Sequence, residues 1–224
     1  NIAHQWRQPL SVISTASTGI IMQKEYGMLE DDKLIDSCNA INHQAQYLSK
    51  TIDDFRNFIK GDRIKSIFSL KDDINSFYNL IEGSLKRHNI KMVFDIDEDI
   101  QIDGYENELV QCFINITNNA KDALKERVEE NRFIFISTSK ENKNAIIKIK
   151  DNGGGIDQEI LPKIFEPYFT TKHQSQGTGL GLHMTYNLIV DGMKGTIEAN
   201  NITYEYENKI YKGTEFIISL PINN

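Results

Sequence analysis

The chain has 224 residues, 39% of them hydrophobic and 25% charged, and a formal net charge of −7 at pH 7. This composition is typical of a globular protein with one or two domains that bury a real core. The acidic charge argues against nucleic acid as a partner, and the two cysteines, both in helix-like segments, argue against a disulfide framework.

The first 60 residues have the periodicity of two long helices. We predict one helix from residue 1 to about 27, with Leu10, Ile13 and Ile20 on one face. We predict a second helix from 31 to about 60, because apolar residues recur there at alternating spacings of four and three. These heptad positions are Leu34, Cys38, Ile41, Ala45, Leu48, Ile52, Phe55 and Ile59.

The two helices are expected to form an antiparallel hairpin that leaves its apolar stripe exposed. A second copy of the chain would bury this stripe in a homodimeric four-helix bundle. The alternative is a hairpin that packs against the rest of its own chain.

After a linker at Gly61-Asp62 the pattern changes to mixed α and β, so we divide the chain into domains 1–62 and 63–224. We predict helices at 71–88, 106 to about 130, and 180 to about 191. Predicted strands are 67–70, 90–96, 101–104, 133–139, 145–150, 196–200 and 214–220. Segment 101–104 is expected to pair with 90–96. Three helices on one face of a mixed sheet would form a two-layer α/β sandwich.

Two glycine clusters bracket a polar segment in the second domain. The first, in DNGGGI, follows a strand pattern that ends at Asp151, and the second, GTGLGL, leads into a helix. Consecutive glycines permit positive φ and close approach of a ligand, and the N–H groups at a helix start bind anions. The segment between them holds aromatic residues and Lys172, which is the composition of a lid with glycine hinges. Neither the Walker motif nor the dinucleotide fingerprint is present.

Asn115 and Asn119 lie one helical turn apart, on a helix whose apolar positions face elsewhere. Two such amides are either simply solvated or part of a polar site.

Taken in order, these motifs resemble the ATPase module shared by sensor histidine kinases and by the chaperone, gyrase and mismatch-repair ATPases, known as GHKL ATPases. DNGGGI and GTGLGL are similar to the two glycine boxes, FEPYFTTK to the phenylalanine box and NITNNA to the N-box. The resemblance covers roughly the last two-thirds of the chain and implies a GHKL-type α/β fold that binds ATP and Mg²⁺. HQWRQPL resembles the H-box that opens the HisKA-like dimerisation helix of histidine kinases.

The resemblance also implies a role for each matching residue. Asn119 corresponds to the Mg²⁺ ligand, through its amide oxygen, and Asn115 to a residue that contacts the phosphates. Asp151 corresponds to the acceptor of the adenine amine, Thr214 to a threonine that backs the adenine, and Lys172 to the cation at the γ-phosphate. The remaining nucleotide-binding positions are Gly153, Gly155, Gly177, Thr178, Gly179, Leu180 and Gly181.

His4 corresponds to the phosphoacceptor. A neutral imidazole has a free lone pair at physiological pH, so it attacks a phosphoryl group without first losing a proton. Gln5 stands where many relatives have a carboxylate beside the histidine. Gln8 stands one turn after His4, where relatives often have Thr or Asn that orients a water for phosphatase activity.

We therefore expect a protein histidine kinase, a transferase of two-component signal transduction. It would phosphorylate itself on His4 from Mg·ATP and pass the phosphoryl group to an aspartate of a response-regulator receiver domain. One alternative is an ATPase that uses water, but such enzymes carry a glutamate where this chain has Asn115, whose amide cannot take a proton. The other is an inactive dimeric scaffold, against which the complete set of His4, Asn119 and Asp151 argues.

The chain has no run of 18 apolar residues and no signal peptide, and it begins without Met inside a helical pattern. We expect a cytoplasmic fragment of a longer protein. The sensor region, and any anchor in the inner membrane, would lie upstream of it.

Overall fold

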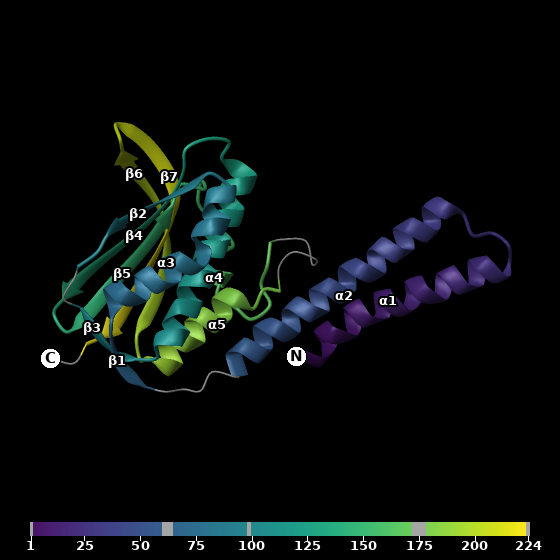
Figure 1. Cartoon of the computed structure of the whole chain (residues 1–224), viewed down its shortest axis with the longest axis horizontal. Helices are drawn as coiled ribbons and strands as arrows, with labels where there is room; N and C mark the ends of the chain where they lie inside the picture. The colour runs from purple at the N-terminus through teal and green to yellow at the C-terminus, as the bar shows by residue number, and fades with distance from the viewer. Residues whose placement is uncertain (1, 60–64, 98–99, 172–177, 223–224) are drawn as a thin grey trace. The chain divides into compact units, whose positions relative to one another are not determined.

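The computed structural model describes residues 2–59, 65–97, 100–171 and 178–222 (Figure 1). The chain splits into two compact units, each described here by itself. The helical unit comprises Asn1–Lys60 and Thr170–Leu180, and the α/β unit comprises Gly61–Phe169 and Gly181–Asn224. Within the described ranges, no helix is both long and apolar enough to cross a membrane.

The helical unit contains two long helices, α1 (Ile2–Glu25) and α2 (Asp31–Ile59), which pack against each other. Both begin and end close to the predicted residues. The end of α1 is fixed by Gly27, whose φ of 66° lies in the left-handed region that favours glycine. The next N–H, that of Met28, bonds back to the carbonyl of Gln23 at 2.8 Å, which completes a C-terminal capping motif.

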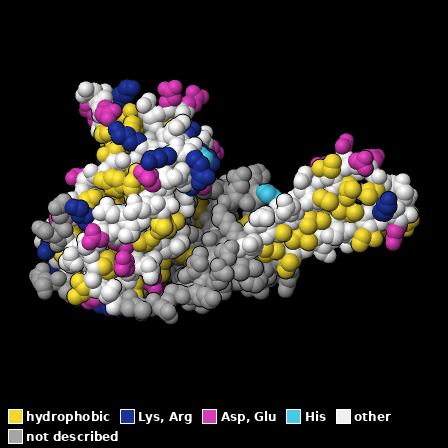
Figure 2. Space-filling model, viewed as in Figure 1, with side chains coloured by type: hydrophobic (Ala, Val, Ile, Leu, Met, Phe, Trp, Pro, Cys, Tyr) yellow, Lys and Arg dark blue, Asp and Glu magenta, His cyan; other side chains and the backbone are white. Residues whose placement is uncertain are grey.

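The hairpin buries only part of its apolar surface. On α2, Leu34, Ile41 and Leu48 are half-buried, whereas Cys38 and Ala45 are exposed. Hydrophobic atoms therefore run along the visible face of the hairpin (Figure 2). The large exposed apolar side chains of this unit are Leu10, Val12, Ile21, Met22, Tyr26, Met28 and Ile35. The side chains of the predicted heptad positions Ile52, Phe55 and Ile59 lie outside the described part of the chain.

The α/β unit is built on a five-stranded mixed sheet with the order β2-β4-β5-β7-β6. Only β2 and β4 run parallel; the other neighbours in this sheet are antiparallel. The strands are β2 (Ile90–Asp95), β4 (Arg132–Glu141), β5 (Asn144–Asp151), β6 (Thr196–Tyr206) and β7 (Lys209–Pro221).

The expected pairing of segment 101–104 with 90–96 is wrong. The short strand β3 (Gln101–Gly104) pairs with β1 (Ser66–Ser69) in a separate antiparallel sheet. β2 instead pairs in parallel with β4, which follows it only after a helix. Proximity along the chain favoured the wrong partner, because a four-residue strand carries too little side-chain pattern to specify its neighbour.

Three helices, α3 (Leu70–Arg87), α4 (Glu106–Arg127) and α5 (Gly181–Asn187), lie on one side of the sheet (Figure 1), which confirms the expected two-layer α/β arrangement. One stripe of α4 faces the core, because its buried residues recur at spacings of three and four. They are Leu109, Cys112, Phe113, Ile116, Thr117, Ala120 and Leu124. A different stripe of α4 remains available for a site.

The helix predicted from 180 to about 191 changes its geometry partway. After Asn187 it continues as a π-helix over Leu188–Gly192, where the Met193 N–H bonds to the Leu188 carbonyl at 3.0 Å. The predicted helix is therefore present over Gly181–Gly192, with π geometry beyond Asn187. Apolar periodicity does not distinguish an α-turn from a turn that holds one extra residue.

β6 and β7 extend beyond their predicted ends into a longer hairpin. We call residues 201–213 the outer hairpin. Its two-residue turn has φ values of 50° at Glu207 and 60° at Asn208, between the paired residues Tyr206 and Lys209. Such turns favour Asn-Gly or Asp-Gly, so the Glu-Asn dipeptide was too weak a signal to reveal the hairpin.

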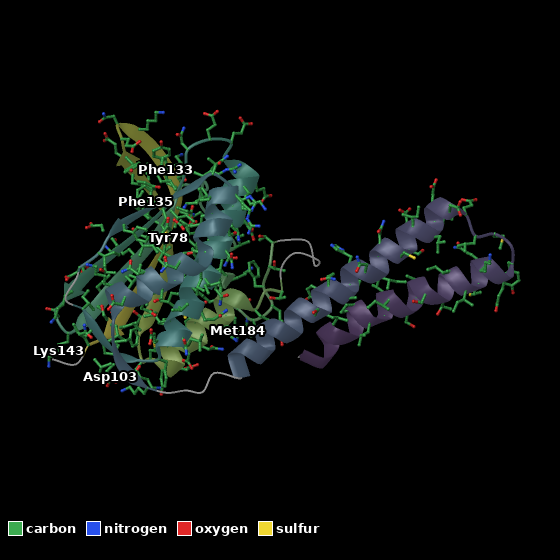
Figure 3. The ribbon with its side chains drawn as sticks, viewed as in Figure 1. Tyr78, Asp103, Phe133, Phe135, Lys143 and Met184 are labelled. Atoms are coloured by element: carbon green, nitrogen blue, oxygen red, sulfur yellow. The ribbon has the colours of Figure 1, made fainter. Side chains whose placement is uncertain are left out.

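Aromatic side chains fasten the outer hairpin to β4. Phe133 and Phe135 of β4 are labelled in Figure 3. The ring centroids of Phe133 and Tyr206 are 5.1 Å apart, and those of Phe135 and Tyr204 are 5.5 Å apart. The ammonium of Lys150 lies 4.4 Å from the centre of the Tyr204 ring. Each such contact contributes on the order of 1 kcal/mol beyond burial, so the hairpin is held against the sheet.

Asp73, in the first turns of α3, is 1% exposed, and neither of its carboxylate oxygens has a hydrogen-bond partner in the described part of the chain. Burial, reinforced by the charge of Glu106, raises the pKa of Asp73 to about 8. The folded state thus binds this proton more tightly than the unfolded chain. Stability is therefore lost as the pH rises from about 4 towards 8.

We expect Asp73→Asn to remove this loss. The variant should lie within about 1 kcal/mol of the wild type at pH 4 and exceed it at pH 9 by on the order of 5 kcal/mol in free energy of unfolding. Urea denaturation at both pH values measures the difference. Asp72→Asn is the matched control, because Asp72 is an exposed neighbour. Equal pH dependence in Asp73→Asn and the wild type would contradict the prediction.

Candidate functional site

One face of α4 organises the candidate site. Asn115, Asn119, Ala123 and Arg127 follow one another at intervals of four residues, so they form a single row along the helix. The contacts of the two ends of this row define where it lies in the fold.

The first end of the row meets the start of α5. The amide nitrogen of Asn115 donates to the Gly181 carbonyl and to the Thr185 hydroxyl, both at 3.2 Å. The Thr185 hydroxyl in turn donates to the Gly181 carbonyl at 2.9 Å. The Asn115 oxygen accepts from Gln111 at 3.3 Å. Asn115 therefore fixes the first turn of the helix that follows the second glycine cluster.

The other end of the row meets the first glycine loop, which we define as residues 153–156. A Cβ at Gly153 would lie 3.0 Å from the Cβ of Ala123, so glycine lets the loop pack closely against α4. Arg127 donates to the Gly155 carbonyl at 2.7 Å. One face of α4 thus contacts both the start of α5 and the first glycine loop, and Asn119 lies between these two contacts.

Asn119 is half-buried, and its amide makes no hydrogen bond to other described residues. An amide oxygen is a hard ligand suited to Mg²⁺, which commonly takes one or two protein ligands together with phosphates and waters. The described residues contain no cluster of three or more His, Cys, Asp or Glu that could hold a metal by themselves. The donor set thus fits an ion that arrives with a phosphate ligand.

Asp151 ends β5 beside the first glycine loop and is 5% exposed. Its Oδ1 accepts the N–H of Gly153 at 2.7 Å and that of Thr214 at 3.3 Å. Burial raises the pKa of Asp151 to about 6, although these two hydrogen bonds and the charge of Arg127 act in the opposite direction. Both bonds reach Oδ1, so within the described residues Oδ2 is left for another donor.

The backbone around Asp151 is closely packed by the outer hairpin. A Cβ at Gly213 would lie 1.8 Å from the Asp151 carbonyl oxygen, so only glycine fits there. The Tyr204 hydroxyl donates to the same oxygen at 3.1 Å. Thr214 follows in β7 and is buried. The backbone at the end of β5, which carries Asp151, is therefore held in place by contacts from β6 and β7.

Two side chains that the sequence did not single out support this region. Asn152 accepts the Phe133 N–H and donates to the Asn131 carbonyl, both at 2.7 Å, and so bridges β5 to β4. His183 of α5 contacts the Phe165 carbonyl through Nδ1 at 2.9 Å and Asn187 through Nε2 at 3.2 Å. A carbonyl only accepts, so Nδ1 carries the hydrogen, and His183 ties the FEPYFTTK segment to α5.

The structure thus brings together, within the α/β unit, Asn115, Asn119, Asp151, Gly153, Gly155, Gly181 and Thr214. Thr178, Gly179 and Leu180 group with the helical unit, where Gly179 has a φ of 64° and the Leu180 N–H bonds to the Thr178 hydroxyl at 3.4 Å. Lys172 and Gly177 lie outside the described residues. His4, Gln5 and Gln8 are in α1, but their side chains lie outside the described part.

Comparison with known proteins agrees with this arrangement. Residues 104–224 match the family model of histidine kinase-, DNA gyrase B- and HSP90-like ATPases. Sporulation kinase D of Bacillus subtilis (strain 168) is 30% identical over 226 residues, which cover 99% of this chain and 40% of that protein. This chain spans less than half the length of the curated relatives it matches.

Solved structures give the same result. The nucleotide-free catalytic domain of histidine kinase ThkA is 31% identical with a TM-score of 0.58, over 70% of this chain and 95% of that one. ThkA in complex with the response regulator protein TrrA is 25% identical with a TM-score of 0.68, over 99% of this chain and 60% of that one. The expected resemblance is confirmed: the chain belongs to the histidine kinase-, DNA gyrase B- and HSP90-like ATPase family, and within it to the sensor histidine kinases of two-component systems.

Proposed function

We propose that the chain phosphorylates itself on His4 from Mg·ATP and passes the phosphoryl group to an aspartate of a response-regulator receiver domain. Residues 1–62 would serve as the dimerisation and phosphoacceptor domain, and 63–224 as the ATP-binding domain. The observation that carries the proposal is the row on α4, which bears Asn119 between the start of α5 and the first glycine loop.

Asp151 is suited to recognise adenine. An ionised Oδ2 accepts a hydrogen bond from the exocyclic amine of adenine, whereas guanine has an oxygen at that position and would be repelled. The two backbone N–H groups on Oδ1 hold the carboxylate in one orientation. Thr214, whose N–H is one of these donors, would lie behind the adenine at the same end of the site.

Asn119 would hold Mg²⁺ through its amide oxygen, because the amide is half-buried and makes no hydrogen bond to another residue that the structure describes. The ion, when bound, supplies positive charge that neutralises the charge on the phosphates. The backbone N–H groups of the second glycine cluster, from Gly177 to Gly181, and the Lys172 ammonium would bind the phosphates themselves.

Asn115 has a more indirect role than the resemblance implies. Both of its amide hydrogens are used by the Gly181 carbonyl and the Thr185 hydroxyl, so it acts by fixing α5 rather than by donating to a phosphate. An amide also cannot serve as the general base of a water-using ATPase. Glu108 lies two turns before Asn115 on the same helix, and its Oε2 is buried beside Gly192, far along α4 from the first glycine loop. These features favour transfer to a side chain over hydrolysis.

At His4, the unprotonated ring nitrogen would attack the γ-phosphorus. An N–P bond forms as the bond to the bridging β–γ oxygen breaks, and ADP leaves. The other ring nitrogen keeps its hydrogen and donates it to an acceptor, for which Gln5 is the adjacent candidate.

The helical unit is proposed to dimerise. Its exposed apolar side chains, among them Leu10, Ile21 and Ile35, would be buried by a second copy in a four-helix bundle. A receiver domain is the proposed partner of this unit, and the solved complex of ThkA with its response regulator supports the assignment. We propose that the chain works in the cytoplasm, with sensory input from segments upstream.

The proposal is tested with γ-labelled ATP. We expect acid-labile, alkali-stable label on the chain, none on His4→Gln, and loss of label from the wild type when a receiver domain is added. Asn119→Ala should also abolish labelling. Release of inorganic phosphate without labelled protein would identify an ATPase instead, and neither product would identify an inactive scaffold.

Gln5 offers a quantitative prediction about the acceptor. A carboxylate beside His4 would stabilise the positive charge that grows on the ring, and charged hydrogen bonds exceed neutral ones by roughly 1 kcal/mol. Gln5→Glu should therefore accelerate autophosphorylation about three- to tenfold, and Gln5→Ala should slow it. Single-turnover labelling at saturating ATP measures the rates, and nucleotide affinity should stay constant. A slower Gln5→Glu variant would contradict the prediction.

A further inference from the structure

The outer hairpin forms hydrogen bonds to the first glycine loop through one side chain, that of Asn201. Its Oδ1 accepts the N–H of Ile156 at 2.7 Å, and its Nδ2 donates to the carbonyl of the same residue at 2.6 Å. A side-chain amide thus pairs with both backbone groups of one residue, as a neighbouring strand would. Because these bonds use its polar atoms, Asn201 is suited to position the loop rather than to contact a ligand.

Two further contacts hold the neighbouring residues of the loop. The Gly154 N–H donates to the Lys212 carbonyl of the outer hairpin at 3.0 Å. Arg127 of α4 donates to the Gly155 carbonyl at 2.7 Å. Three consecutive residues, Gly154 to Ile156, are therefore fixed from β6, β7 and α4.

The fit around Asn201 is close. A Cβ at Gly155 would lie 2.7 Å from the Asn201 Oδ1, and the φ values of Gly154 and Gly155 are 87° and 88°. Residues with side chains rarely adopt these angles. The two glycines let the loop turn sharply enough to reach Asn201.

The loop in turn orients the proposed adenine-binding carboxylate. Its first residue, Gly153, donates the shorter of the two hydrogen bonds to the Asp151 Oδ1, at 2.7 Å. The Tyr204 hydroxyl of the outer hairpin donates a further hydrogen bond to this residue, to the Asp151 carbonyl. A continuous set of contacts thus leads from Asn201 through Ile156 and the loop to Asp151.

We propose that Asn201, assisted by Arg127, is a positioning residue that holds the first glycine loop, and through it Asp151, in the arrangement that binds nucleotide. The inference rests on the proposed function, in which this site binds ATP. It assigns to the outer hairpin a role in nucleotide affinity. Free of Asn201, the loop would have to be ordered when nucleotide binds, and affinity would fall by the free energy of that ordering.

Asn201→Ala in the full chain tests the proposal by calorimetry with Mg·ATP. We expect the Kd to rise about tenfold, whereas the labelling rate at saturating ATP should change less than twofold, because the reacting groups are untouched. Asn201→Asp should bind no better than Asn201→Ala, since its second oxygen faces the Ile156 carbonyl. Asn200→Ala, an exposed neighbour on β6, is the matched control and should keep the wild-type Kd.

Two further measurements separate positioning from a loss of folding. Amide exchange at Ile156 should accelerate in nucleotide-free Asn201→Ala while exchange in β4 and β5 stays slow. Arg127→Met, at an exposed residue, should also raise the Kd, and the double variant should bind more tightly than the product of the two single effects predicts, because both free the same loop.

A wild-type Kd in Asn201→Ala would overturn the inference and leave the proposed function standing. An unchanged Kd for Asn201→Ala with a reduced labelling rate would also overturn it, because that is the signature of lost active protein. Tight, Asn201-dependent nucleotide binding without any labelled His4 would overturn the kinase proposal alone. A wild-type chain that binds no nucleotide would overturn both.

Discussion

Asp151→Asn is expected to abolish detectable binding of Mg·ATP and, at the same time, to stabilise the nucleotide-free protein at pH 7. The asparagine keeps an oxygen for the N–H groups of Gly153 and Thr214, so the loop and β7 remain bonded. The position of Oδ2 becomes an N–H donor that faces the donating amine of adenine. One substitution therefore preserves the fold and reverses the complementarity to the base.

The gain in stability follows from the pKa. The pKa of Asp151 is raised from 3.8 to about 6, chiefly by burial, so the folded state holds this proton more tightly than the unfolded chain. Stability is lost as the pH rises from about 4 to 6, and at pH 7 the loss is on the order of 2 to 3 kcal/mol. Asparagine does not ionise, so the variant should recover much of that loss at pH 7 and almost none at pH 4.

Calorimetry and thermal unfolding measure the two effects on the same samples. In the wild type, affinity for nucleotide should fall as the pH drops through about 6, because the protonated carboxyl no longer accepts as an anion. Near-wild-type affinity in Asp151→Asn would overturn the assignment of Asp151 to adenine. Lower stability of the variant at pH 7 would show that the carboxylate, and not its neutral form, is favoured by the fold.

Ile41→Lys combined with Leu48→Lys is expected to yield monomers. The two residues lie seven apart on α2, at heptad positions of the apolar stripe that a second copy would bury. Each lysine would bring a charge into a desolvated interface at a cost of several kcal/mol, which together corresponds to a rise of more than a thousandfold in the dimer dissociation constant.

Light scattering at micromolar concentration measures the mass, and circular dichroism reports whether the helices persist. The matched control is Asn39→Lys with Gln46→Lys, which adds the same charges with the same spacing at exposed polar positions of α2. The control should remain dimeric. A dimer in the Ile41→Lys, Leu48→Lys variant would mean that the apolar stripe packs on the chain's own α/β unit instead.

Local patterns in the sequence identified most elements of this fold. Helix periodicity located α1, α2, α3 and α4, because a buried stripe recurs every three to four residues whatever it packs against. Gly27 marked the end of α1 since the left-handed conformation there excludes most other residues. The spacing of Asn115 and Asn119 placed both on one helix face for the same local reason.

Long-range pairing could not be predicted in the same way. β3 joins β1, and the outer hairpin folds back on β4, because side-chain contacts between distant segments decide these arrangements. The turn at Glu207 and Asn208 carries little local preference, so its conformation depends on the aromatic contacts that follow it.

The sequence by itself identified the family through its two glycine motifs, and it predicted a nucleotide site at Asn115, Asn119, Asp151 and Thr214 because these positions match the motifs of that family. Only the tertiary structure decided how they are supported. It directed the Asn115 amide to α5, left the Asn119 amide unbonded among the described residues, and set Asn201 against Ile156. The physical reason is that an amide side chain pairs equally well with many partners, and only the packing of distant strands and helices selects which one it meets.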